Sequence, residues 1–186
     1  MADTIATAFR SHGTRCAAWL TRPPTPGPHP MVVLAHGLGA NHTMALSRYE
    51  QHFAAAGIAA LSFDYRHLGA SGETPRQRLG LRRHRQDIAA ALDFVRGLPG
   101  VEPTRIALWG TSLGAMHVLR VAAERPELAA VVVQCPIVDG PAVCAARGCR
   151  PCCGSARRSS RMLCAAPPDS AADTFLSSDS RAAWPP

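Results

Sequence analysis

Four short apolar runs constrain the fold of this 186-residue chain more than any other feature of its sequence. They are residues 31–37 (MVVLAHG), 57–65 (GIAALSFDY), 105–110 (RIALWG) and 128–136 (LAAVVVQCP). Each has the length and composition of a strand that is buried on both faces of a parallel sheet. The stretches with helical character between them are residues 42–56, 81–95 and 113–124. This alternation predicts an α/β fold, with a mostly parallel sheet flanked by helices.

The connecting segments carry the turn signals that such a fold needs. Residues 7–23 predict two short strands around a turn at 11–13, and the proline-rich stretch 23–30 predicts a connector. Residues 66–73 are expected to form a loop. The stretch GLPGVEP, residues 97–103, is expected to end the helix that precedes it.

The character of the sequence changes at about residue 141. Residues 1–140 are expected to form the α/β core, whereas residues 141–186 are dominated by Ala, Ser, Arg, Pro and Cys and show no sustained period. Such a composition predicts a tail of low order. All 20 basic residues are Arg, which suggests a GC-rich gene, and a shifted reading frame would explain the sharp boundary.

Charge and hydropathy argue against a nucleic-acid or membrane partner. The net charge of +7 divides into +4 for residues 1–140 (14 Arg against 10 acids) and +3 for residues 141–186 (6 Arg against 3 acids). No aromatic residues interleave with the arginines, and the cluster of Arg at 76–85 is interpreted as a solvated helix face. No signal peptide or membrane-length apolar run is apparent, so the cytoplasm is the expected location.

No cofactor or metal site is expected from the motifs. The core shows no phosphate loop, dinucleotide fingerprint or metal-ligand spacing. Cys149 and Cys152 form a C-x-x-C pattern, but neither the paired ligand spacing of zinc sites nor the context of a redox motif accompanies it. Only Cys16 and Cys135 lie in the core, which is consistent with reduced thiols.

Residues 110–114, GTSLG, predict a serine nucleophile. They lie where a β-branched apolar run changes to a helical pattern, which is the layout of a tight strand-to-helix turn that presents a serine hydroxyl. Gly110 and Gly114 allow the strand end to approach the helix start closely. The backbone N–H of Leu113 would open the helix and could bind an oxyanion, assisted by the helix dipole. Ser112 is therefore the candidate nucleophile.

The stretch HGLG, residues 36–39, ends the first buried strand and supplies a second candidate element of the site. A turn at this position can carry a further oxyanion donor, and the N–H of Leu38 is the candidate. The alternative is a plain glycine-rich connection between a strand and a helix.

Three stretches together resemble landmarks of the α/β-hydrolase superfamily, in order and in spacing: VVLAHGLGA, FDYRHLGASGE and RIALWGTSLGA. The longer LPGVEPTRIALWGTSLGAMHVL and VVVQCPIVDG resemble its dienelactone-hydrolase and Xaa-Pro-peptidase-like branch. The resemblance covers residues 5–140. It implies a small-molecule ester or amide substrate, Ser112 as nucleophile, and Leu38 and Leu113 as oxyanion donors. In such proteins an acid and a histidine follow later strands, and the match here stops after residues 128–136.

The general base of such a mechanism has no convincing candidate in this sequence. His117 is the last histidine, and its place on the helix after the nucleophile directs it away from the hydroxyl. His36 resembles a structural hydrogen-bonding residue of the family. His42 and His67, on loops, are the only stand-ins to test, while Asp139 is interpreted as a turn residue, with a catalytic acid as the alternative. Two hypotheses follow: a serine hydrolase by ancestry with doubtful activity, or a truncated, non-catalytic core that is inert or acts only by binding.

The sheet is expected to be incomplete at its C-terminal edge. Without further strands, residues 128–136 form an edge whose backbone groups lack ladder partners, and the run carries no charge before Asp139. Natural proteins protect such edges with charge, proline or a bulge. Low solubility, self-association through this edge, or the need for a partner that supplies the missing strands is therefore predicted.

Overall fold

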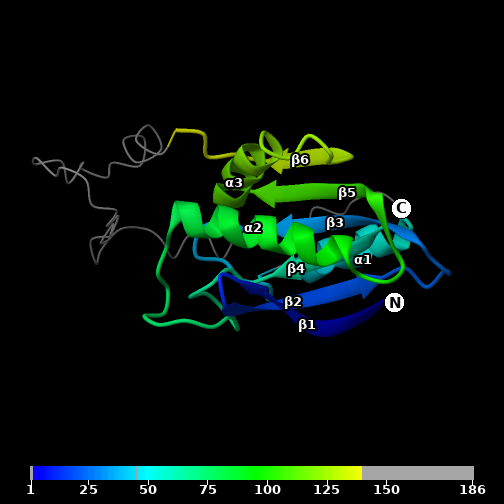
Figure 1. Ribbon diagram of the computed structural model, residues 1–186, viewed down its shortest axis with the longest axis horizontal. Helices are drawn as coiled ribbons and strands as arrows, with labels where there is room; N and C mark the ends of the chain where they lie inside the picture. The colour runs from blue at the N-terminus through cyan, green and yellow to red at the C-terminus, as the bar shows by residue number, and fades with distance from the viewer. Residues whose placement is uncertain (1, 45, 140–186) are drawn as a thin grey trace, which may run out of the picture. The chain divides into compact units, whose positions relative to one another are not determined.

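The computed structural model describes residues 2–44 and 46–139, which form a sheet with helices on both faces (Figure 1). The six strands are β1 (Asp3–Ser11), β2 (Thr14–Arg22), β3 (His29–Ala35), β4 (Ala59–Phe63), β5 (Val101–Thr111) and β6 (Ala130–Gln134). The three helices are α1 (Leu46–Ala55), α2 (Leu81–Arg96) and α3 (Leu113–Ala122). The predicted tail, residues 141–186, lies outside the described residues together with its C-x-x-C motif.

The strand order in the sheet is β1-β2-β4-β3-β5-β6. Strands β4, β3, β5 and β6 are parallel, while β1 pairs with β2 and β2 pairs with β4 in antiparallel fashion. The mostly parallel α/β sheet predicted from the sequence is confirmed. Because the carboxyl ends of parallel strands lie at one end of the sheet, the loops that follow β3, β4 and β5 gather there.

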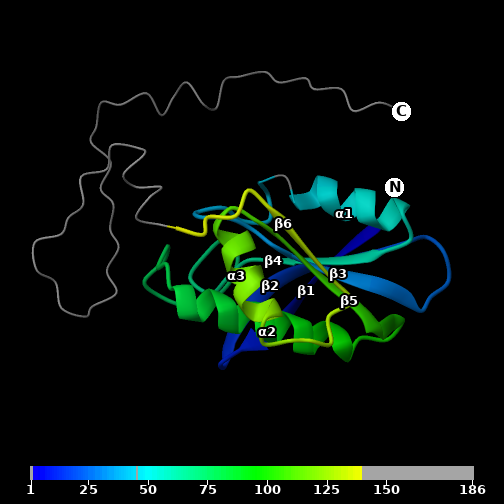
Figure 2. The ribbon, with the colours of Figure 1, turned by 90° about the horizontal axis from the view of Figure 1, so that it is seen from above.

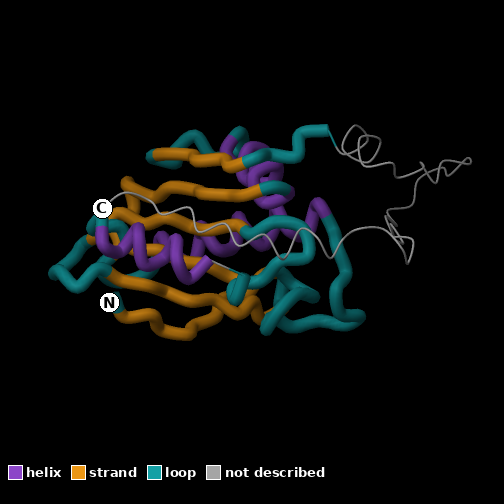
Figure 3. The backbone as a smooth tube through the Cα atoms, turned by 180° about the vertical axis from the view of Figure 1, so that it is seen from behind, coloured by secondary structure: helices purple, strands orange, loops and turns teal. Residues whose placement is uncertain are grey.

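Helix α1 covers one face of the sheet, and α2 and α3 cover the other (Figure 2; Figure 3 shows the α1 side from behind). Alternate residues of a strand therefore enter different cores. Met31 and Val33 of β3 belong to the larger core beneath α2 and α3, whereas Val32 and Leu34 pack into the smaller core beneath α1. All four are essentially inaccessible to solvent, which explains the uninterrupted apolar run in the sequence.

Strand β5 begins earlier than the sequence analysis predicted. The expected strand started at residue 105, because the preceding glycine and proline suggested a loop. In the structure Val101 pairs with His29, and the register shifts between His29 and Met31. The additional residues thus extend the sheet through a pairing irregularity, which no local pattern announces.

A buried ion pair joins α2 to the sheet. The Arg66 guanidinium lies 2.6 Å from the Asp87 carboxylate, which also accepts a hydrogen bond from the Ser11 hydroxyl at 2.6 Å. Burial raises the pKa of Asp87, opposed by the hydrogen bonds from Ser11 and Arg66. Breaking such a pair leaves an uncompensated buried charge, so it holds these three segments together.

Strand β6 is the edge of the sheet formed by the described residues. All of its residues but one are exposed to solvent, and Val131 and Val132 expose 40% and 48% of their surface. Within the described residues the strand has the edge position that the sequence predicted. Its self-association remains a prediction.

Candidate active site

The turn between β5 and α3 holds Ser112 in a strained backbone conformation. Its φ is 56° and its ψ is −120°, a combination that L-residues with side chains rarely adopt. Such a residue costs about 1–3 kcal/mol and persists only where the surrounding structure imposes it. The strand-to-helix turn predicted from the sequence is thus present, with the serine at its apex.

Close contacts between backbones impose this turn. A Cβ on Gly114 would lie 2.3 Å from the carbonyl oxygen of Ala35, so α3 packs directly against the end of β3. A Cβ on Gly110 would lie 2.8 Å from backbone atoms of Gly114. A Cβ on Gly37 would lie 3.1 Å from the Cβ of Ser112. The glycines therefore bring the turn after β3 against the serine.

Backbone hydrogen bonds fix the serine to the neighbouring segment. Ser112 N–H donates to the carbonyl of Gln134 at 2.9 Å, and Ile137 N–H donates to the Ser112 carbonyl at 3.2 Å. Among the described residues, the Ser112 hydroxyl has no hydrogen-bond partner. The backbone is thus fully used to hold the turn, and the hydroxyl is left for another group.

The two candidate oxyanion donors lie on the segments that these contacts join. Leu113 is the first residue of α3, and the N–H groups of a first helical turn have no partner within the helix. Leu38 lies in the turn after β3, one residue beyond Gly37, and its side chain is 57% exposed. The close contact between Gly37 and Ser112 brings the backbone of this turn to the serine, while the Leu38 side chain faces solvent.

A carboxylate that the sequence analysis did not select fixes the loop beyond Leu38. Asp64 is buried, and its two oxygens accept the backbone N–H of His42 at 2.7 Å and of Ala70 at 2.8 Å. A Cβ on Gly69 would lie 1.9 Å from this carboxylate. The available signal was an Asp immediately after the second buried run, in the stretch FDY.

His36 has a structural environment. It follows β3, its Nδ1 lies 2.9 Å from the carbonyl oxygen of Gly37, and it is buried. Burial lowers its pKa, with the Gly37 hydrogen bond and the charge of Asp64 acting in the opposite direction. The ring is therefore neutral at physiological pH and contacts Tyr65.

The two histidines considered as substitute bases have other partners. His42 stacks on Trp19 with ring centroids 3.8 Å apart, and its Nε2 lies 3.0 Å from the buried Glu50 carboxylate. His67 is buried, and its Nδ1 lies 3.0 Å from the carbonyl oxygen of Pro75. Nothing in these contacts directs either ring to the serine hydroxyl.

His117 and Asp139 complete the candidates named from the sequence. His117 is fully buried, and its ring contacts His84 of α2, so it lies in the interface between the two helices. Asp139 is exposed and ends the described part of the chain. No group of His, Cys, Asp or Glu side chains suited to a metal ion occurs within residues 2–44 and 46–139.

A family model described as "Hydrolase_4: Serine aminopeptidase, S33" matches residues 26–180. The chain belongs to this family of α/β hydrolases. The matched range continues past residue 140, into the part of the chain that the structure does not describe. The superfamily resemblance inferred from the three motifs is confirmed.

Curated relatives include several hydrolases of bacteria and fungi. The chain is 45% identical over 132 residues to the quorum-quenching protein AidA of Acinetobacter baumannii, covering 71% of this chain and 43% of the relative. It is 36% identical over 107 residues to the thiohydrolase apmlB of Arthrinium phaeospermum (58% and 35%), and 35% identical over 127 residues to the esterase FrsA of Salmonella paratyphi B (68% and 30%). The chain spans less than half the length of each of these relatives.

Solved structures share the fold. The α/β hydrolase GrgF from a Penicillium species superposes with a TM-score of 0.70 at 25% identity, covering 77% of this chain and 50% of that one. The hypothetical protein PA2218 of Pseudomonas aeruginosa gives a TM-score of 0.67 at 29% identity, with coverages of 71% and 42%. The described part of the family member has the α/β-hydrolase fold, and it contains no helix long and apolar enough to cross a membrane.

Proposed function

We propose that this chain is the nucleophile-bearing core of a serine hydrolase that acts on ester or amide bonds of small molecules. The observation that carries the proposal is the backbone of Ser112, held at a φ of 56° between a buried strand and a helix. Strain of this kind clusters at functional sites. The neighbouring Leu38 and Leu113 N–H groups are the proposed oxyanion donors.

In this mechanism the Ser112 oxygen forms a bond to the acyl carbon, and the carbonyl oxygen takes up the electron pair as an oxyanion. The N–H groups of Leu38 and Leu113 would stabilise that charge, as preorganised donors do in acyl transfer. The hydroxyl proton passes to a base and then to the leaving group, whose bond to the acyl carbon breaks as the oxyanion re-forms the carbonyl. Water later displaces the acyl group from the serine and restores the hydroxyl.

The proposed substrate class is defined by the bond that the enzyme would cleave, and the relatives indicate which bond this is. The names thiohydrolase and esterase among the relatives support an acyl substrate with an oxygen or sulfur leaving group, and the description serine aminopeptidase of the family model supports an amide. We keep the cytoplasm as the proposed location, because Cys16 and Cys135 are free thiols. Nucleic acid is not a proposed partner.

A second candidate function is binding without turnover. It is favoured by the Ser112 hydroxyl, which has no hydrogen-bond partner among the described residues, and by the contacts of His42 and His67 with other groups. A serine without a base is a poor nucleophile. In this case the oxyanion turn would bind an acyl compound without cleaving it.

Hydrolysis of a p-nitrophenyl ester by the chain and by its Ser112→Ala variant separates the two candidates. The hydrolase predicts that the variant loses about 10³-fold or more of kcat, as expected when a nucleophile is removed. Equal rates for the two proteins would contradict the hydrolase and favour binding. The Ser11→Ala variant, which removes a buried hydroxyl beside Asp87, is the control for a general effect on folding.

A further inference from the structure

Four ring side chains form a buried cluster between the sheet and helices α2 and α3: His36, Tyr65, His84 and His117. Their exposed fractions are 2%, 1%, 2% and 0%. Tyr65 stacks on His84 with centroids 4.2 Å apart, and His84 meets His117 edge to face at 5.2 Å and 85°. The cluster thus joins α2 to α3, and through His36 and Tyr65 it includes residues of the segments that follow β3 and β4.

Apart from His36 Nδ1, the side-chain polar atoms of this cluster lack hydrogen-bond partners among the described residues. Both ring nitrogens of His84, both of His117, Nε2 of His36 and the Tyr65 hydroxyl are buried and unpaired. Buried polar groups are normally hydrogen-bonded, so such a concentration is unusual. A neutral imidazole carries one N–H, for which an edge-to-face ring is a weak acceptor. A protonated imidazole carries two N–H groups and a charge, and the cluster offers them no acceptor.

The charges that face the two helical histidines are positive. Arg83 and Arg66 act on His84, and Arg85 acts on His117. Burial, as the larger effect, and these cations lower the pKa of His84 to about 3 and of His117 to about 4. His117 and His36 also lower the pKa of His84, and His36 lowers that of His117.

Two carboxylates border the cluster, and neither pairs with the helical histidines. Asp64 faces His36, but its oxygens accept the two backbone N–H groups described above. Asp87 faces Tyr65, but it pairs with Arg66. Within residues 2–44 and 46–139, the rings of His84 and His117 therefore have no anion in contact that would compensate a positive charge.

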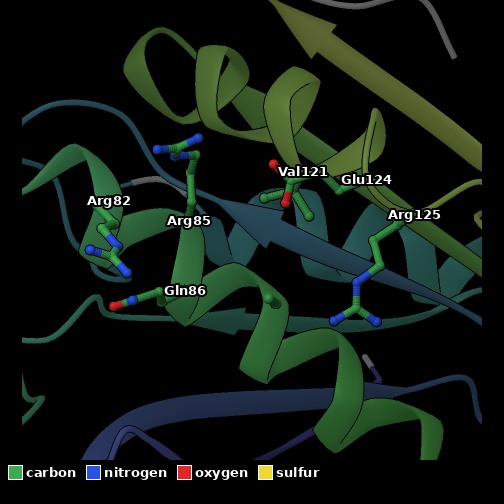
Figure 4. A pocket seen from close by; sticks show the side chains of 7 residues that line it. Arg82, Arg85, Gln86, Val121, Glu124 and Arg125 are labelled. Atoms are coloured by element: carbon green, nitrogen blue, oxygen red, sulfur yellow. The ribbon is translucent and has the colours of Figure 1, made fainter.

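We propose that the neutral rings of His84 and His117 form an acid-sensitive contact between α2 and α3, which opens when either ring gains a proton. A surface groove of about 290 Å³ lies over the same pair of helices (Figure 4). Arg82, Arg85 and Gln86 of α2 line one side of it, and Val121 and Glu124 contribute from the α3 side. Water can reach the charged ring from this groove once the helices separate.

The contact bears on the active-site turn through α3. Ser112 immediately precedes this helix, and His36 immediately precedes the turn that carries Leu38. Movement of α3 away from α2 would alter the positions of these backbones together. The inference goes beyond the proposed function and does not depend on it, because the contact can be measured without any substrate.

The direction of the pH effect follows from the depressed pKa values. A histidine in an open or unfolded segment has a pKa of about 6.5, so it binds a proton more readily than the buried ring does. The closed contact between α2 and α3 has its full stability above about pH 6.5 and loses it progressively as the pH falls toward 4. Between pH 7 and pH 5 each ring is expected to raise the opening constant roughly 20-fold.

Hydrogen exchange of the full chain tests the proposal. Protection factors, which correct for the intrinsic effect of pH on exchange, are compared at pH 7 and pH 5 for peptides from α2, α3 and the β1–β2 hairpin. We expect α2 and α3 to lose at least 20-fold more protection than the hairpin does. The double variant His84→Phe/His117→Phe should abolish this difference, whereas His52→Phe, at an exposed site on α1, should retain it.

Equal losses in the helices and the hairpin, or an unchanged loss in the double variant, would overturn the proposal. If the double variant fails to fold, NMR titration of the histidine Cε1–H signals of the wild-type chain tests the proposal. The proposal requires two buried histidines that remain neutral at pH 5.5 in the folded protein. Titration of all eight histidines near pH 6.5 without unfolding would refute it.

Discussion

At the scale of single residues, backbone contact rather than side-chain bonding defines the turn at Ser112. The serine adopts a φ of 56°, and Gly114 packs so closely against β3 that any side chain there would overlap the Ala35 carbonyl. Overpacking of this kind forces the backbone to move. The conformation of the serine is therefore imposed by its glycine neighbours.

Replacement of Gly114 by alanine tests this dependence. The added Cβ would lie 2.3 Å from the Ala35 carbonyl oxygen, so we expect a loss of about 1–3 kcal/mol in the free energy of unfolding. Urea denaturation measures the loss. Gly97→Ala is the matched control, because a Cβ there would lie 3.7 Å from its nearest contact and φ is −90°. Equal stabilities of the two variants would contradict the packing account.

Asp64 is the second residue on which the site depends. Its carboxylate accepts backbone N–H groups from two separate loops and is buried. We expect Asp64→Ala to cost about 2–4 kcal/mol, because two partly buried N–H donors lose a buried, charged acceptor. Hydrogen exchange at His42 and Ala70 should accelerate in the same variant.

The control for this variant is Asp93→Ala, which removes an exposed carboxylate paired with Arg125. Exposed ion pairs contribute about 0–1 kcal/mol, so its unfolding should change little. An Asp64→Ala protein as stable as the Asp93→Ala protein, with unchanged exchange at His42, would show that the loop is held by other contacts.

At the scale of elements, β6 differs from the other parallel strands. β3 and β4 are buried along nearly their whole length, whereas β6 pairs with β5 alone among the described strands and exposes Val131 and Val132. Exposed apolar edge strands pair readily with other chains. β6 is thus an exposed apolar edge of the described sheet.

A charge on this edge should reduce self-association. We expect the apparent mass of the chain in light scattering to rise with concentration, and we expect Val132→Lys to suppress that rise, since lysine protects natural edges. Ile5→Lys is the matched control: Ile5 is 52% exposed and lies on β1, at the opposite edge of the sheet. A wild-type chain that remains monomeric at all concentrations would contradict the prediction.

At the scale of the whole molecule, the sequence predicted what depends on local pattern. The turn at Ser112 could be predicted because a buried strand, two glycines and a helix lie within a few residues of one another. The hydrogen bond from His42 N–H to Asp64 and the contact of His84 with His117 could not be predicted in this way, because they join segments that are far apart in the chain. The early start of β5 likewise depends on a pairing with β3.

The difference between local pattern and long-range contact also explains which parts of the function could be predicted from the sequence. Family membership follows from three local motifs, and the family model confirms it. The base that would activate Ser112 belongs to long-range structure, and the described residues give the hydroxyl no partner. The nucleophile is therefore the part of the mechanism that this chain can test by itself.

Covalent labelling of Ser112 tests the central claim most directly. A fluorophosphonate reacts with an activated serine by forming a phosphorus–oxygen bond and releasing fluoride, so one label adds a fixed mass to the intact chain. The account predicts a single adduct, located by peptide mass spectrometry at Ser112, and no adduct on the Ser112→Ala variant. An unlabelled wild-type chain, or equal labelling of the variant, would contradict the assignment of Ser112 as the nucleophile.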